Sequence, residues 1–291
     1  MECGIVLHGS NILSAEEAME EILGAGFRSF EYSCGHVKKL EDEGGGSFDR
    51  AAGSASSLGL EPVQLHGPSL EAGFDLGSPD EATRRWSIER SSLWIQHCSN
   101  LGVPVMVEHG CEYHDDFDAT MGRMKASFAE LASAAGEHGV RVAIENEFDP
   151  RGMVRRGAGR EMVIPARVGC TMAELLEVVN DVDPDNLGVC LDFGHANLQR
   201  PLYPLEVAIR ELGDALLATH IHDNEGQTDQ HMAPLMGNID WEPTMEALDG
   251  VGYDRPVILE VGGISVGDGK IRENRLRLYR CAGLEITGFP R

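Results

Sequence analysis

Carboxylate and imidazole side chains that can bind a metal ion recur along this 291-residue chain, and nearly all of them lie at the end of a short apolar run. They are Glu31, His66, His109, Glu145, Asp192, His195, His220, His222 and Glu260. Mixed oxygen and nitrogen ligands suit Mn²⁺, Co²⁺, Zn²⁺, Fe²⁺ or Mg²⁺. Four protein ligands on a six-coordinate ion would leave two positions for substrate oxygens, as metal-ion catalysis requires.

Eight apolar runs of strand length alternate with amphipathic segments along the whole chain. The predicted strands are Gly4–His8, Ser29–Ser33, Val63–His66, Val103–Glu108, Val140–Glu145, Leu187–Asp192, Leu216–His222 and Val257–Val261. The predicted helices include Ser14–Leu23, Asp80–Asn100, Asp118–Glu137, Thr171–Asn180 and Pro243–Leu248. This alternation predicts an α/β fold, a (β/α)₈ TIM barrel that occupies residues 1–291 as a single domain. A doubly wound dinucleotide fold is the alternative, but no predicted strand precedes a complete G-x-G-x-x-G.

The barrel would bring the metal-binding side chains together, because the C-terminal ends of all its strands meet at one rim. A single histidine or glutamate at a strand end usually has an ordinary structural role. Random placement does not readily put such residues at seven of the eight predicted strand ends. Burying several carboxylates in one place costs several kcal/mol each unless a cation balances them. The pattern therefore predicts a divalent-metal site at the mouth of the barrel.

The composition limits the classes of binding partner and the cellular compartment that we expect. The formal net charge of −24 disfavours binding to nucleic acid, which usually needs a basic surface. The seven cysteines are scattered and never in C-x-x-C spacing, so neither a disulfide framework nor a zinc knuckle is expected. There is no signal peptide pattern and no apolar run of membrane-spanning length. We expect a cytoplasmic protein with no nucleic-acid or membrane partner.

Five short motifs resemble the xylose-isomerase-like barrels, a superfamily that includes sugar phosphate isomerases and epimerases. They are Val142-Ala143-Ile144-Glu145-Asn146, Leu191-Asp192-Phe193-Gly194-His195, His220-Ile221-His222-Asp223-Asn224, Gly237-Asn238-Ile239-Asp240-Trp241 and Ile258-Leu259-Glu260. Each motif is only moderately specific, but all five occur in order on the expected strands. The resemblance extends from about Val63 to Glu260.

This resemblance implies a metal-dependent isomerase or epimerase that removes a proton beside a metal-chelated carbonyl group. It also implies a small-molecule carbohydrate substrate, namely a sugar, sugar phosphate or related polyol. Carried over from ketose 3-epimerases, the metal ligands are Glu145, Asp192, His220 and Glu260, and the two glutamates are the catalytic acid/base pair. His222 is two residues after His220, so it lies on the same face of the strand and is the alternative ligand. His195 is expected to contact a substrate hydroxyl group.

Apurinic endonucleases of the same superfamily provide the alternative. Their three-zinc site resembles a set that this chain also carries: His66, His109, Glu145, Asp192, His195, His220, Asp229, His231 and Glu260. A multinuclear-zinc phosphoesterase therefore stays open, as does a lyase or dehydratase on the same scaffold. So does a barrel that binds a sugar or a metal without turnover, because fold alone does not fix function.

Several further residues are candidates for secondary roles. The segment from Pro150 to Cys170 contains five arginines and one acid, and as a lid it could offer Arg155 and Arg156 to an anionic substrate, or else pair with the acidic surface or a second subunit. Trp241 is a candidate for bordering the pocket. Trp86 and Trp94 share a predicted helix and are expected to pack against neighbouring helices. A homo-oligomer is compatible with the sequence.

Overall fold

The computed structural model describes residues 1–291 except 115, 149–153, 158–159, 164–166, 199–203 and 289–291. Between residues 149 and 166 it describes no side chains, so the predicted contacts of Arg155 and Arg156 lie outside the described residues.

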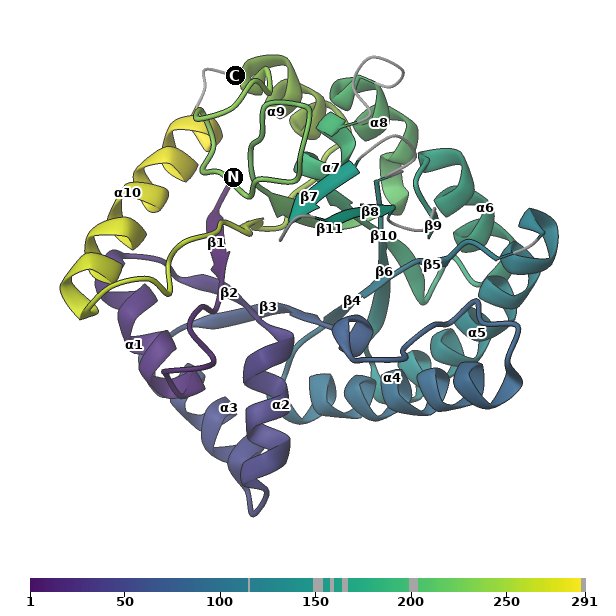
Figure 1. Ribbon diagram of the computed structural model, residues 1–291. Coiled ribbons are helices and arrows are strands. Elements are labelled where there is room, and N and C mark those ends of the chain that lie inside the picture. Colours follow the sequence, from purple (N-terminus) through teal and green to yellow (C-terminus); the bar gives the residue numbers. More distant parts are fainter. Residues whose placement is uncertain (115, 149–153, 158–159, 164–166, 199–203, 289–291) are drawn as a thin grey trace.

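Eight parallel strands close into a barrel in the order β1-β12-β11-β10-β6-β4-β3-β2, which confirms the predicted fold (Figure 1). The strands are β1 (Cys3–Val6), β2 (Ser29–Tyr32), β3 (Glu61–His66), β4 (Val105–His109), β6 (Arg141–Glu145), β10 (Leu187–Asp192), β11 (Leu216–Ile221) and β12 (Val257–Leu259). Four strands, β1, β2, β11 and β12, end before the predicted C-terminal residue. His8 and His222 follow β1 and β11 instead of ending them.

Helices surround the ring of strands and cover its outer face (Figure 1). They are α1 (Ala15–Ala25), α2 (Cys34–Glu43), α3 (Ser47–Leu58), α4 (Glu81–Leu101), α5 (Phe117–His138), α6 (Met172–Val182), α7 (Phe193–Leu198), α8 (Leu205–Leu212), α9 (Trp241–Gly250) and α10 (Gly269–Thr287). Two short 3₁₀ turns, η1 (Pro68–Leu70) and η2 (Gly213–Ala215), lie between them. Ser14 opens α1 with a capping box to Glu17, as the sequence around it predicts.

Strand periodicity explains how the barrel positions its polar residues. Inside the barrel, Val107, Ala143, Cys190 and Ala218 form a cluster of buried side chains. Successive side chains on a strand alternate between its two faces, so the residues two positions further along point to the same interior. Those residues are His109, Glu145, Asp192 and His220. A layer of small apolar side chains thus supports a layer of candidate metal ligands.

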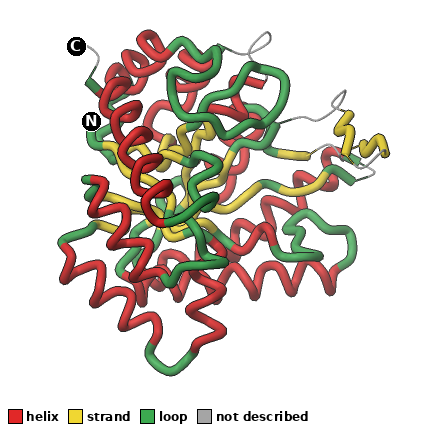
Figure 2. Tube along the Cα trace, turned by 60° about the vertical axis from the view of Figure 1, so that its left-hand side comes forward, coloured by secondary structure: helices red, strands yellow, loops and turns green. Residues whose placement is uncertain are grey.

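The segment after β6 contains three short strands that do not belong to the barrel. β9 (Arg167–Val168) pairs antiparallel with β5 (Cys111–Glu112), which follows β4. β7 (Val154–Gly157) and β8 (Arg160–Val163) form an antiparallel hairpin. Figure 2 shows this hairpin standing out from the body of the barrel. Among the described residues, no helix is both long and apolar enough to cross a membrane.

Candidate metal centre

Strand register brings the candidate ligands side by side at the mouth of the barrel. His109 on β4 is the register partner of Glu145 on β6, and Asp192 on β10 is the partner of His220 on β11. Both pairs lie at the C-terminal ends of their strands. The predicted convergence of side chains from distant segments is therefore present in the structure.

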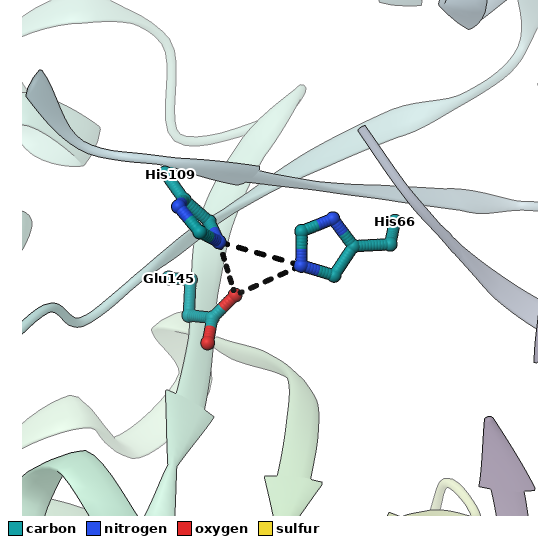
Figure 3. A group of neighbouring side chains, drawn as sticks. All are labelled: His66, His109 and Glu145. Atoms are coloured by element: carbon teal, nitrogen blue, oxygen red, sulfur yellow. Dashed lines mark hydrogen bonds and ion pairs between the residues drawn. The ribbon is translucent and has the colours of Figure 1, made fainter. Parts of the chain in front are cut away.

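A first group joins His66, His109 and Glu145, whose ligand atoms lie within 4.8 Å of one another (Figure 3). The two Nε2 atoms are 3.3 Å apart, and Glu145 Oε2 is 3.8 Å from His66 Nε2 and 3.4 Å from His109 Nε2. Two imidazole lone pairs that point at each other at this distance repel unless a proton or a cation lies between them. The group thus has the donor arrangement of a metal site.

A second group joins Glu145, Asp192, His220 and Glu260, again with one ligand atom from each within 4.8 Å of the others. His220 Nδ1 is 3.2 Å from Glu145 Oε1 and 3.5 Å from Glu260 Oε2. Asp192 and His220 are fully buried, while the Glu260 side chain keeps 23% of its surface exposed. These four residues are the set that the sequence predicts for a single divalent ion.

Further ligand groups adjoin the second one. Asp192, His195 and His222 form one, and His222, Asp229 and His231 form the other. Asp229 Oδ2 is 3.0 Å from His231 Nε2 and 3.7 Å from His195 Nε2. All six additional candidates from the sequence therefore lie within or beside the same mouth.

Most of these histidines have their second ring nitrogen fixed by an acceptor. His66 Nδ1 donates to the Gly67 carbonyl oxygen at 3.2 Å, and His195 Nδ1 donates to the Asn146 carbonyl oxygen at 2.9 Å. His231 Nδ1 donates to the carbonyl oxygen of Glu260 at 2.9 Å. A carbonyl oxygen only accepts, so each bond places a proton on Nδ1 and leaves Nε2 as the nitrogen that faces the mouth.

Carboxylates fix the second ring nitrogen of two further histidines. His109 Nδ1 lies 3.0 Å from Glu147 Oε1, and His220 Nε2 lies 2.8 Å from Glu31 Oε2. A carboxylate that accepts from a ligating histidine raises the basicity of the ring and orients it toward the metal. His220 therefore presents Nδ1, and not Nε2, to the second group.

His222 differs from these five histidines. Its Nε2 lies 3.1 Å from the Asp192 carboxylate, and its Nδ1 has no partner among the described residues. The ring packs so closely on Gly194 that a Cβ there would come within 1.8 Å of it, which explains the glycine in the Asp192-Phe193-Gly194 turn. This geometry supports His220 over its rival as the fourth ligand.

The electrostatics of the mouth favour a bound cation. Burial disfavours the charged form of Glu145, yet His220 and His109 outweigh it and hold the pKa of that carboxyl well below its usual range. Burial likewise opposes protonation of His109, but Glu147 and Glu145 raise its pKa to about 10. Without a metal, protons on the imidazoles would have to balance the buried carboxylates. A divalent ion can replace those protons.

Unpaired buried atoms provide the test of fit. Glu145 Oε2, His220 Nδ1 and Asp229 Oδ1 are buried and have no hydrogen-bond partner among the described residues. All three residues belong to the ligand groups. Leaving such atoms unpaired costs about 1–3 kcal/mol each, and a coordinated ion would satisfy them. The residues present therefore fit one or more divalent cations.

A cavity of about 390 Å³, called the mouth pocket here, opens above the ligands. Its walls include His66, His109, Glu145, His195, Asp229, His231 and Glu260. Asp192 and His220 lie behind this wall and are not accessible from it. The two glutamates thus have access both to the ligand group and to any molecule in the mouth pocket.

Sequence reasoning missed two residues of the site, Glu147 and Phe148. Glu147 orients His109, and Phe148 lines the mouth pocket. Glu147 could have been found, because it has the same parity as Glu145 just beyond the end of β6. Arg167, one of the five arginines that the sequence places near the mouth, also lines the pocket and pairs with Glu147, in a position that depends on the β5–β9 pairing.

Trp241 lies beneath the loops and not in the pocket wall. Its ring is buried, its Nε1 donates to Asp223 Oδ2 at 3.0 Å, and it stacks on Phe193. Asp223 also accepts from the backbone of Asn224 and Ile239. Trp241 therefore holds the loop after β11 in place, and this position does not support direct contact with a substrate.

Comparison with known proteins gives a family and several relatives. Residues 19–281 match the family described as xylose isomerase-like TIM barrel. An uncharacterised protein of Methanocaldococcus jannaschii is 30% identical over 202 residues, which cover 68% of this chain and 64% of that protein. A probable endonuclease 4 of Methanosphaerula palustris is 30% identical over 55% of this chain and 50% of that protein. A ketose 3-epimerase of Arthrobacter globiformis is 26% identical, over 57% and 55% respectively.

Each of these matches spans between half and two thirds of the relative's length. Among solved structures, a D-tagatose 3-epimerase-like protein superposes with a TM-score of 0.76 at 22% identity, over 99% of this chain and 98% of that one. A D-psicose 3-epimerase from Clostridium cellulolyticum has a TM-score of 0.75 at 20% identity, over 99% of both chains. At this level of identity the superpositions establish the fold.

Proposed function

The chain belongs to the xylose isomerase-like TIM barrel family, and we propose that it is a divalent-metal-dependent isomerase or epimerase acting on a sugar, sugar phosphate or related polyol. The observation that carries this proposal is the second ligand group. Glu145, Asp192, His220 and Glu260 offer four ligand atoms within 4.8 Å of one another, and the two glutamates also line the mouth pocket.

In this proposal the four residues have different tasks. Asp192 and His220 are fully buried and would hold the ion from below. A divalent ion in this position would hold a carbonyl oxygen and a neighbouring hydroxyl oxygen and stabilise the negative charge that develops there when a proton leaves carbon. Glu145 and Glu260 both reach the mouth pocket and can accept that proton or return one.

The polar wall of the mouth pocket suits a polyhydroxylated substrate. His195, Asp229 and His231 stand above the second group and offer donors and acceptors to hydroxyl groups. The ketose 3-epimerase of Arthrobacter globiformis and the two sugar 3-epimerase structures are relatives whose names match this chemistry. Their similarity supports the reaction class and leaves the identity of the sugar to experiment.

Solvent exchange tests proton abstraction directly. The purified protein, loaded with Mn²⁺ or Co²⁺, is incubated with a panel of ketoses in deuterium oxide, and incorporation of deuterium is measured by NMR. Glu145→Gln and Glu260→Gln should each reduce exchange by more than about 100-fold, because general acid–base catalysis contributes factors of about 10²–10⁴. Both should largely retain the metal, since glutamine keeps an oxygen ligand.

The exposed Glu137 on α5 provides the matched control, because Glu137→Gln changes the same functional group far from the mouth. Exchange at the wild-type rate in both mouth variants would remove these two glutamates from the acid/base role. Absence of exchange with every ketose in the wild-type protein would count against the reaction itself.

A multinuclear phosphoesterase is the second candidate. The observation that favours it is the additional ligand groups, above all the two Nε2 atoms of His66 and His109 that lie 3.3 Å apart beside Glu145. A mononuclear epimerase does not need this pair as ligands. The probable endonuclease 4 of Methanosphaerula palustris is the relative whose name matches this alternative.

The number of bound metal ions separates the two candidates. Mass spectrometry of the metals in the purified protein, together with hydrolysis of bis(4-nitrophenyl) phosphate and cleavage of DNA that contains an abasic site, gives the answer. One ion per chain without hydrolysis supports the isomerase or epimerase. Three zinc ions with hydrolysis would replace it by the phosphoesterase.

A further inference from the structure

A second cavity lies beside the mouth pocket and has a different chemical character. This side pocket has a volume of about 510 Å³ and lies between α2, η1 and α4. Cys34, Pro68, Leu70, Ala72, Trp86 and Trp94 form most of its apolar wall. A volume of this size is in the range of small-molecule binding sites, which is about 300–1,000 Å³.

Leu70 joins the two cavities. Its side chain lines both the mouth pocket and the side pocket, and 66% of its surface is exposed. Leu70 ends η1, which directly follows the strand that carries His66. A ligand held at the metal site could therefore extend across Leu70 into the side pocket.

Cys34 contributes a small side chain to the side pocket. It begins α2 directly after β2, and its side chain lines this cavity. Leu70 is therefore the residue that the two pockets share.

The floor of the side pocket is rigid. Trp94 is buried, donates from Nε1 to Glu41 Oε1 at 3.2 Å, and carries the Arg90 guanidinium above its ring. Arg90 also pairs with Glu71 at 2.7 Å, which ties α4 to the loop after η1. A wall held by these contacts does not need to rearrange when a ligand enters, and preorganisation of this kind favours binding.

Trp86 offers an exposed indole ring to the side pocket. Its ring keeps 39% of its surface exposed, with Phe74 at its edge, whereas packing against neighbouring helices would leave it covered. Exposed indole faces stack on planar apolar groups, and a sugar ring alone would not fill a cavity of this size beside the mouth pocket. The occupant that suits both cavities has a polyol part and an aromatic part.

We propose that the side pocket is a binding subsite for an aryl group attached to the polyhydroxylated substrate, so that the protein acts on aryl glycosides whose sugar ring carries a keto group, or on similar conjugates with a free carbonyl, and not only on free sugars. This inference rests on the proposed function for the polyol part. The apolar subsite itself is independent of turnover and can be tested without it.

Calorimetric titration tests the subsite with 2-naphthol, which carries the aryl group without a sugar. The wild-type protein should bind 2-naphthol saturably. Trp86→Ala removes the stacking surface and Ala72→Trp fills the cavity from an exposed position, so each should weaken binding by at least about tenfold, or 1.4 kcal/mol. Leu93→Ala is the matched control, because Leu93 is an exposed apolar residue of the same helix that lines neither pocket.

The link to the mouth pocket is tested with 2-naphthyl glycosides of several hexoses. At least one should bind more tightly than 2-naphthol and more tightly than its own methyl glycoside. No binding of 2-naphthol, or equal binding by all four proteins, overturns the proposal. Displacement of 2-naphthol by a single-stranded oligonucleotide would also overturn it, in favour of a nucleobase. If 2-naphthol binds as expected but no ketose exchanges deuterium, the sugar reaction fails and the aryl subsite stands.

Discussion

At the scale of single residues, the mouth of the barrel is organised by how each imidazole is oriented. His220 gives Nε2 to Glu31 and directs Nδ1 toward Glu145 and Glu260. His222, two residues later, contacts the Asp192 carboxylate instead. We therefore infer that His220 would be a ligand of the second group and that His222 would act as a partner of the ligand Asp192.

This difference predicts different costs for the same substitution. His220→Asn should lower the affinity of the second group for Mn²⁺ by more than about 100-fold. Replacing a residue that only orients a metal ligand already lowers metal affinity by about 10–100-fold. Glu31→Gln and His222→Asn should each lower the Mn²⁺ affinity by only about 10–100-fold. Isothermal titration with Mn²⁺ measures all three. A larger loss in His222→Asn than in His220→Asn would reverse the assignment.

The titration of the histidines predicts how the metal-free protein responds to pH. Burial opposes their protonation, but nearby carboxylates raise the pKa of His109 to about 10 and of His231 to about 9, against 6.5 in an unperturbed side chain. The stability gained from these protons is complete below pH 6.5 and is lost as the pH rises through about 9 and 10.

The free energy of unfolding of the chelated protein should therefore decrease between pH 7 and pH 10. Urea denaturation in the presence of a chelator measures it, with the metal-loaded protein as the control. The metal-loaded protein should lose less, because its ligand histidines are already deprotonated. Equal pH profiles with and without metal would contradict this account.

At the scale of elements, alternation along β4 directs the neighbouring side chains of Glu108 and His109 to opposite faces of the strand. His109 points into the barrel, whereas Glu108 is fully buried on the other face of β4, where its Oε2 accepts from Ser91 Oγ of α4 at 2.7 Å. A Cβ on Gly67 would come within 2.7 Å of that oxygen. Glu108 thus fastens α4 and the loop after β3 to the barrel wall.

Burial raises the pKa of Glu108 to about 7, despite the hydrogen bond from Ser91. The folded state therefore binds a proton that the unfolded state releases near pH 4.5, and the charged carboxylate destabilises the protein as the pH rises toward 7. Glu108→Gln should remove a cost on the order of 3 kcal/mol at pH 8, since one pKa unit is about 1.4 kcal/mol. Thermal denaturation at pH 5 and pH 8 tests this. The variant should be more stable than the wild-type protein only at pH 8, and lower stability at both pH values would contradict the prediction.

At the scale of the whole molecule, the ligands come from strands spread around the closed barrel. His66, His109, Glu145, Asp192 and His220 belong to β3, β4, β6, β10 and β11. An ion in this mouth would link strands that are far apart in sequence and would bind only the folded chain. Its binding energy would therefore add to the stability of the entire barrel.

Removal of metal should accordingly lower the melting temperature of the whole protein in one transition. At a free metal concentration 100-fold above its Kd the stabilisation is about 2.7 kcal/mol, which corresponds to about 4 °C for a protein of this size. Differential scanning calorimetry with and without a chelator, followed by re-addition of Mn²⁺, measures the shift and its reversal. An unchanged melting temperature would mean that no ion is bound in the mouth.

The sequence by itself determined the barrel and the membership of its mouth. Period-two alternation sends His109 and Glu145 inward above Val107 and Ala143, and parallel strands then bring their C-terminal ends to one rim. Those rules act within a strand or between neighbours, so they can be read from local pattern.

Only the tertiary structure decided which partner each ligand has. Glu31 on β2 meets His220 on β11 across the barrel, 189 residues apart in sequence. Trp86 lines a side pocket that η1 and α2 complete. Contacts of this kind depend on how the strands are staggered when the barrel closes and on how loops pack over its rim. No local periodicity records that geometry, because it arises only when distant segments meet.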